Sequence, residues 1–251
     1  MRAWLAPTID RSGGCVTLLN TMPALRDGRV PNMVCPACLK EGVLKWRPEA
    51  PDELTCTGCG RRITEAAFPA SGKLSFDGMD FEFYQAPGNP QKFFLKPNLR
   101  YIKSLYAMTR ARDLARLGKT KKDLESAARA LAIMTAYADY YRQYICNVAG
   151  NQPYRPGWPR QCNWGRITHF GDYVFPKNFC SLYSDLASSD LSITPAQRAA
   201  CRSLLETMIS EVTLPFIRQV GGMGNPMGAA YADCIAAGQL FPEGPFIDYY
   251  T

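Results

Sequence analysis

The chain has 251 residues, of which 47% are hydrophobic and 20% are charged, and this balance is that of an ordinary globular protein. It holds no run of about 18 apolar residues, which excludes a membrane-spanning helix, and no apolar segment follows residues 1–7 as a secretory signal would require. The formal charge of +7 favours anionic partners, but it does not separate nucleic acid, an acidic glycan and a charge that only aids solubility.

Residues 1–31 form a lead-in that shows no periodicity. Residues 32–66 follow it and contain two cysteine pairs. Each pair has the spacing Cys-x₂-Cys, and seventeen residues separate the pairs. Four thiolates on two tight turns make a tetrahedral set that suits Zn²⁺, and because protein groups fill every position, none remains for water or substrate. We therefore expect a zinc ribbon that holds structure, with rubredoxin-like iron as the alternative ion. Its ligands are Cys35, Cys38, Cys56 and Cys59.

Short strands are expected around and after these cysteines. Residues 43–47 indicate a strand, Pro48 and Pro51 predict a turn, and 53–55 lead back. Residues 67–96 form a β-like connector in which 76–79 (FDGM) predict a hairpin turn between two strands. The remaining cysteines are spaced singly, which indicates free buried thiols rather than a disulfide framework. These are Cys15, Cys146, Cys162, Cys180, Cys201 and Cys234.

Helical periodicity begins after Pro97. The apolar spacing predicts one helix over 98–117, ended by Gly118, and a second helix that runs from an N-cap at Thr120 to about Ile145. Because the connection between them is short, the two helices are expected to form an antiparallel hairpin.

Three further helices are predicted after an irregular stretch over 146–175. They span 176–187, 195–212 and the stretch from Asn225 to near Gly238, and the dipeptide Thr194-Pro195 starts the second of them. The predicted fold class is therefore mainly α, with a helical domain over 97–251 preceded by the small β zinc ribbon.

The segment 158–173 is the part of the chain richest in side chains that bind ligands. Tryptophan stacks on sugar rings or bases, arginine holds carboxylate or phosphate, and the only histidine, His169, can transfer a proton near neutral pH. The alternative is a long loop packed on the helical core. The residues that we expect to bind a ligand are Trp158, Trp164, Arg166 and Tyr173.

A second candidate is the glycine-rich break over 221–224, which precedes Asn225. A side-chain amide there can donate to an anion while the glycines let the backbone approach a ligand. The alternative is that Asn225 only caps the helix that Pro226 opens. The sequence contains neither a glycine motif for nucleotide binding nor a nucleophile elbow, which disfavours nucleotide cofactors and serine-hydrolase chemistry.

The order of these segments resembles the N-terminal half of heparinase II/III-like polysaccharide lyases. The resemblance covers roughly residues 32–240 and rests on the Cys-Pro-x-Cys ribbon, the aromatic connector and the helical-hairpin pattern. Its motifs are 111–118 (ARDLARLG), 127–132 (AARALA), 137–141 (YADYY), 164–167 (WGRI) and 224–226 (GNP), the last continuing to Tyr231.

This resemblance implies an incomplete (α/α) toroid, followed in the family by β-sandwich domains, and β-elimination across a uronic-acid linkage. In that reaction an amide, Arg or His neutralises the carboxylate, a Tyr or His removes the neighbouring proton, and an acid assists the leaving oxygen. Asn225 is the expected neutraliser, and Tyr231 and Tyr173 are the candidate bases. Arg166 and His169 would help to hold the uronate, and His169 is also a catalytic candidate.

Two departures from the family limit the expected activity. Five helices are about half of a full toroid, and the sandwich that usually contributes a catalytic histidine is missing, so we expect a truncated part of a lyase that binds an acidic polysaccharide and can be inactive by itself. The family is usually exported, whereas the free thiols and the missing signal point inward. Two other classes stay open: a zinc-ribbon module with a helical domain that binds nucleic acid or a protein, and a purely structural helical scaffold.

Overall fold

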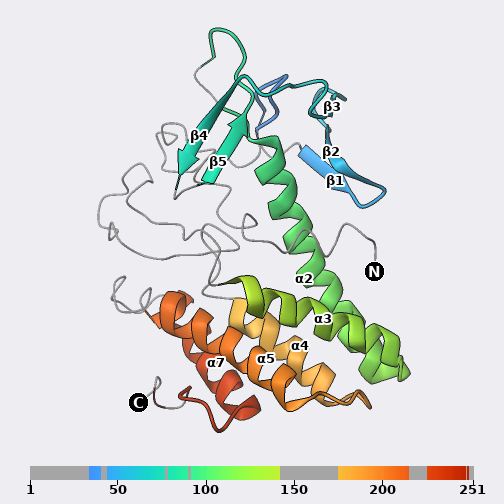
Figure 1. Ribbon diagram of the computed structural model, residues 1–251, viewed down its shortest axis with the longest axis vertical. Coiled ribbons are helices and arrows are strands. Elements are labelled where there is room, and N and C mark those ends of the chain that lie inside the picture. Colours follow the sequence, from blue (N-terminus) through green and yellow to red (C-terminus); the bar gives the residue numbers. More distant parts are fainter. Residues whose placement is uncertain are drawn as a thin grey trace.

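The computed structural model describes residues 34–40, 44–76, 79–89, 92–141, 175–214, 225–246 and 248. Within these residues the chain forms five α-helices, a small three-stranded antiparallel sheet and a two-stranded hairpin. Figure 1 shows the strands at one end of the molecule and most helices at the other, joined by the long helix α2 (Leu95–Lys121). The prediction of a mainly helical fold with a small β ribbon is therefore confirmed, while the lead-in over 1–31 lies outside the described residues.

The ribbon sheet has the order β1-β2-β3, with β1 (Leu44–Arg47), β2 (Ala50–Cys56) and β3 (Arg62–Ile63) all antiparallel. The predicted strands are present, and β2 begins earlier than expected. Pro51 is tolerated in this central strand because it falls where the β1–β2 register shifts, so no ladder hydrogen bond is needed from it. The side chains that the sheet buries come from every strand: Leu44, Leu54 and Ile63.

The connector folds as the predicted hairpin of β4 (Gly72–Phe76) and β5 (Met79–Phe83). Phe76 pairs with Met79, so the hairpin closes where the sequence predicts a turn. At its open end Gly72 faces Phe83, and a Cβ on this glycine would lie 2.7 Å from the ring. The ring of Phe83 therefore covers the glycine, an arrangement that supports a strand lacking a side chain there.

The boundary between α2 and α3 (Leu124–Tyr140) differs from the prediction. The helix α2 does not end at Gly118 but continues to Lys121. This glycine lies where α3 approaches, and a Cβ on it would lie 2.6 Å from that of Ala127. The chain breaks at Lys122, which has a φ of 57°. Asp123 is the N-cap of α3, and its side chain accepts from the backbone of Ser126.

Thr120, the predicted N-cap, lies inside α2 instead. Its hydroxyl donates to the carbonyl of Arg116 within the same helix, at 2.7 Å. The helix α3 ends at Tyr140, and Ile145, the predicted end, lies outside the described residues. The antiparallel hairpin of two helices is nevertheless present.

The remaining helices complete the helical body. They are α4 (Phe175–Ala187), α5 (Pro195–Met208), which continues as the π-helix η5 (Ile209–Thr213), and α7 (Asn225–Leu240). Thr194 starts α5 as predicted: its side chain accepts from the backbone of Gln197, whose side chain accepts from the backbone of Thr194 in return. Among the described helices none is long and apolar enough to cross a membrane.

Two buried clusters share α2. The smaller holds the ribbon side chains together with Phe68, Phe93, Leu95 and Leu99, so the first turns of α2 belong to it. The larger begins at Ala107 on the same helix and includes α3, α4, α5 and α7. Because one continuous helix belongs to both clusters, the ribbon is fixed against the helical body. The described helices establish a mainly helical fold, and the toroid stays a prediction.

Candidate metal centre

The four predicted ligands lie together. The sulfur atoms of Cys35, Cys38, Cys56 and Cys59 are all within 4.8 Å of one another, with 3.9 Å between Cys35 and Cys59 and 3.7 Å between Cys38 and Cys56. Four sulfurs that each bind one ion at about 2.3 Å in a tetrahedron are about 3.8 Å apart. The two S–S distances of 3.9 and 3.7 Å therefore match the spacing of a tetrahedral metal site.

Two turns of the same geometry present these thiols. In the first, the backbone N–H of Leu39 donates to the carbonyl of Cys35 at 2.9 Å, and in the second, Gly60 donates to Cys56 at 2.8 Å. The residue after each cysteine pair has a positive φ, 59° at Leu39 and 73° at Gly60. Such turns aim backbone N–H groups at the first sulfur of each pair, as the sequence spacing predicts.

Burial and backbone amides act on these thiols in opposite directions. Cys35 and Cys56 are fully buried, Cys38 is half-buried and Cys59 is exposed. Burial raises the pKa of the Cys35 thiol to about 12. Burial also opposes ionisation of Cys56, but the N–H and the sulfur of Cys59 bring its pKa down to about 7. A coordinated metal ion would deprotonate all four thiols, because its charge exceeds these effects.

Two of the basic side chains of the ribbon, those of Arg62 and Arg47, form ion pairs with Glu53 within the sheet. Arg62 donates to Glu53 through two nitrogens, one of them Nε at 2.9 Å, and Arg47 lies 3.9 Å from the same carboxylate. The Glu53 side chain is only 10% exposed. These arginines therefore brace the strands, and the other basic residues of the ribbon, Lys40, Lys45 and Arg61, are exposed.

Most residues of the predicted ligand site fall outside the described residues. These are Trp158, Trp164, Arg166, His169 and Tyr173. Asn225 is the first residue of α7, and Tyr231 is 36% exposed on the same helix, six positions further on. The described residues thus place these two on one helix but do not bring the predicted catalytic group together, and it stays a prediction.

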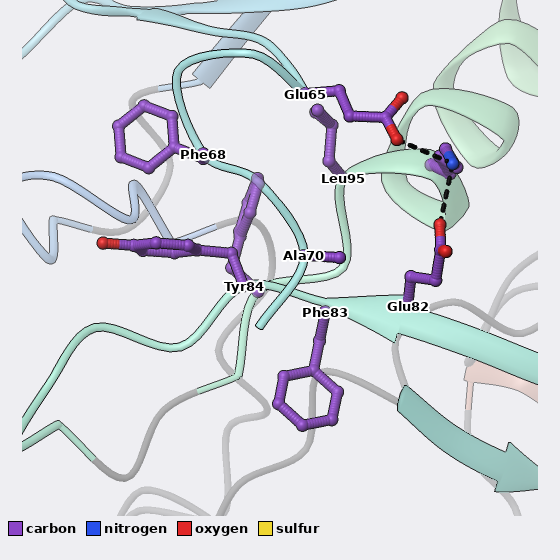
Figure 2. A pocket seen from close by; sticks show the side chains of 9 residues that line it. Glu65, Phe68, Ala70, Glu82, Phe83, Tyr84 and Leu95 are labelled. Carbon is purple, nitrogen blue, oxygen red and sulfur yellow. Dashed lines mark hydrogen bonds and ion pairs between the residues drawn. The ribbon is translucent and has the colours of Figure 1, made fainter. Parts of the chain in front are cut away.

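A shallow, open pocket lies between the β4–β5 hairpin, the segment 65–70 and the first turn of α2. Figure 2 shows the rings of Phe68 and Tyr84 on one side and the carboxylates of Glu65 and Glu82 on the other. Both carboxylates contact the ammonium group of Lys96, at 2.9 and 2.7 Å. The sequence does not reveal this pocket, because its lining comes from three separate segments.

The described cysteines outside the ribbon are free and buried, as predicted: Cys180, Cys201 and Cys234. Cys15, Cys146 and Cys162 lie outside the described residues. Comparisons of the chain with models of protein families, with curated proteins and with solved structures found no match. Within the described residues, the four-cysteine cluster is the best-defined candidate site, and it can hold a metal ion.

Proposed function

We propose that the four cysteines bind one Zn²⁺ ion whose role is structural. The observation that carries this proposal is the spacing of the sulfurs, 3.7 and 3.9 Å on two opposite edges, which matches tetrahedral coordination. Four thiolate ligands leave no coordination position for water, so the ion is not expected to hydrolyse a substrate. Since Cys35 and Cys56 belong to the smaller buried cluster, the ion would hold the sheet and the two turns together.

Metal analysis of the purified chain tests this proposal. We expect one zinc per chain by elemental mass spectrometry, and we expect the substitution Cys56→Ser to remove most of it. Cys201→Ser is the matched control, because this cysteine is also fully buried but lies in the helical body. Stoichiometric iron with visible absorption would assign the site to iron, and a chain that binds no metal after refolding with zinc would overturn the proposal.

We further propose that the helical body is part of an incomplete (α/α) toroid that binds acidic polysaccharides, as in a β-eliminating lyase. Repeated hairpins of helices support this proposal. Helices α2 and α4 pack side by side, and their contacts advance in step along both: Arg112 donates to Asn178 at 3.0 Å, and Lys119 contacts Asp185 at 2.8 Å. The two helices therefore run in the same direction, as the corresponding helices of successive hairpins do in such toroids.

Gel mobility in the presence of polymers tests this second proposal. The chain would be run in gels that contain alginate, a glycosaminoglycan, pectin, a neutral glucan or duplex DNA, at about 150 mM salt to suppress nonspecific attraction. Retardation by a uronate polymer alone is the expected result, and absorbance of an unsaturated uronate would report elimination. Retardation by DNA alone would instead favour the ribbon as a nucleic-acid-binding module.

A further inference from the structure

Helix α7 carries a carboxylate in an unusual position. Asp233 is fully buried, and neither of its carboxylate oxygens has a hydrogen-bond partner of normal geometry within the described part of the chain. Buried carboxylates are normally paired or hydrogen-bonded, because an isolated negative charge is costly in an apolar environment. The charged form of Asp233 is therefore poorly accommodated by the fold as described.

The groups around Asp233 come from the two helices that meet there. Helix α4 contributes Lys177 and Cys180, and α7 itself contributes Cys234. The ammonium group of Lys177 and a weak contact from the backbone N–H of the same residue favour the charged form, and the Lys177 side chain is exposed. The short helix η5 also packs against α7 and carries one acidic residue, Glu211.

Burial outweighs the influence of Lys177. It raises the pKa of Asp233 to about 7, from an ordinary value near 3.8. A carboxyl group with a raised pKa in the folded state favours that state while it is protonated. This preference is complete below about pH 4 and is lost progressively as the pH rises to about 7, where the buried group must ionise or leave its environment. The contact between α4 and α7 is thus weakest in neutral to alkaline solution.

We propose that the α4–α7 contact is a pH-controlled element, closed when Asp233 is protonated and opened when it ionises, and that opening exposes the thiols of Cys180 and Cys234. Both thiols are buried in this contact, and burial raises the pKa of each, to about 12 and about 11, so they are unreactive while the helices are packed. The element would link the reactivity of two thiols to pH without a disulfide or a metal ion.

Thiol labelling resolved by mass spectrometry tests this inference on the intact chain. Cys201 is the internal reference, because it is equally buried on α5 and its pKa is raised to about 12 by burial alone, with no carboxylate involved. The rate for Cys180 is divided by the rate for Cys201, which removes the general increase of thiol reactivity with pH. For a carboxyl whose pKa falls from about 7 to its ordinary value on opening, this ratio rises about tenfold between pH 6 and pH 8.

Two variants complete the design. Asp233→Asn removes the charge, and the ratio is expected to stay flat with pH; Asp190→Asn, a surface carboxylate paired with Lys122, is expected to behave as the unsubstituted chain. A flat ratio in the unsubstituted chain, or the same rise in Asp233→Asn, would overturn the inference. If Asp233→Asn does not fold, the pH series of the unsubstituted chain still decides, since an absent rise contradicts the proposal directly.

Discussion

Leu39 and Gly60 occupy equivalent positions in the two cysteine turns, yet only the second is a glycine. Both have a positive φ, 59° and 73°, where an L side chain is strained by about 1–2 kcal/mol while glycine is not. Leu39 is also 52% exposed, so its side chain gains little from packing. The ribbon therefore stores backbone strain in its first turn that its second turn avoids.

Glycine at position 39 and leucine at position 60 should change the free energy of unfolding in opposite directions. We expect Leu39→Gly to raise the free energy of unfolding by up to about 1 kcal/mol, since relief of strain exceeds the entropy that glycine loses on folding. Gly60→Leu should lower it by about 1 kcal/mol for the same reason. Urea unfolding of the metal-bound chain measures both, and equal signs for the two substitutions would contradict the explanation.

Arg198 ties the C-terminal turn to α5 through several contacts at once. Its guanidinium lies 4.8 Å from the ring centre of Phe241 and donates to the carbonyl of Leu240 at 3.0 Å and to the hydroxyl of Tyr183 at 3.1 Å. It also donates to both carboxylate oxygens of Glu243, at 3.2 Å each. Only a planar group with several donors can make all of these contacts together.

Arg198→Lys should therefore destabilise the protein although it keeps the charge. We expect a loss of about 1–2 kcal/mol, mostly from the stacking on Phe241 and the part-buried hydrogen bond to the Leu240 carbonyl, because the ion pair is 39% exposed on the arginine side and contributes little. Arg129→Lys is the control, since Arg129 and Glu125 form an ion pair on the surface of α3 that contributes only a few tenths of a kcal/mol. Equal thermal shifts for the two variants would refute the argument.

At the scale of elements, Gly118 shows how a helix-breaking signal can be overruled by packing. Glycine weakens a helix by about 1 kcal/mol relative to alanine, which is why the sequence predicts an end there. The structure uses the glycine to bring α2 and α3 together, as the 2.6 Å approach of an added Cβ to Ala127 demonstrates. This close contact involves a residue nine positions away, and periodicity along one helix does not reveal it.

Gly118→Ala should for this reason destabilise the chain in spite of its better helix propensity. Because the obstructing atom is the short, rigid side chain of Ala127, the two helices must move apart, at a net loss of about 1–2 kcal/mol. The double substitution Gly118→Ala with Ala127→Gly restores the space. A double-mutant cycle measured by denaturant unfolding should give a favourable coupling, and a coupling near zero would exclude the steric explanation.

Of the two helix N-caps that the sequence predicts, Thr194 is correct and Thr120 is wrong. The signal at Thr194 is correct because a capping box is local: a hydroxyl, Pro195 and a glutamine at the third position suffice. The signal at Thr120 is wrong because two neighbouring residues, Thr120 and Asp123, both have the chemistry of a cap, and the choice between them depends on where α2 ends. The π-helix η5 has no local signal at all, although the predicted end of the helix, Val212, lies within it.

These two threonines provide a matched test of the element boundaries. Thr194→Ala removes a side chain that accepts from a helix N-terminus, and we expect a loss of about 1 kcal/mol. Thr120→Ala removes only a bond to a carbonyl inside α2 and introduces a better helix former, so its effect should be within about 0.5 kcal/mol. A larger loss for Thr120→Ala would support the boundary that the sequence predicts.

For the whole molecule, the two buried clusters predict separate responses to loss of metal. Treatment with a chelator should release the ribbon sheet, since its cluster is small and two of its members, Cys35 and Cys56, are ligands in the proposed zinc site. The helical body should remain folded. Hydrogen exchange measured by mass spectrometry should show protection lost over β1, β2 and β3 but kept in α3, α4 and α5, and zinc should restore it. Cooperative loss of protection throughout would show that the body depends on the metal.

The distinction between local and distant information explains which parts of the molecule the sequence predicts. Cysteine spacing, hairpin turn and helix periodicity act over short stretches of the chain, and the clustering of the four cysteines, the hairpin and the presence of the described helices are confirmed, whereas the zinc ion stays a proposal. The pocket beside Lys96 and the burial of Asp233 depend on segments that meet only in the folded chain. The ligand site predicted around His169 lies outside the described residues, so its tryptophans and arginine stay predictions.

The continuous helix α2 links movement of the ribbon to movement of the helical body. Its 27 residues make a rod about 40 Å long. A tilt of about 10° at the ribbon would displace the distant end by about 7 Å for a rod of that length. The Trp46–Tyr106 ring contact at 5.1 Å and the ion pair of Lys103 with Asp52 at 2.8 Å brace the rod near its first half. Since the second half of α2 belongs to the larger cluster, a tilt at the ribbon would carry the helical body with it, and the two ends of the rod would move as one unit.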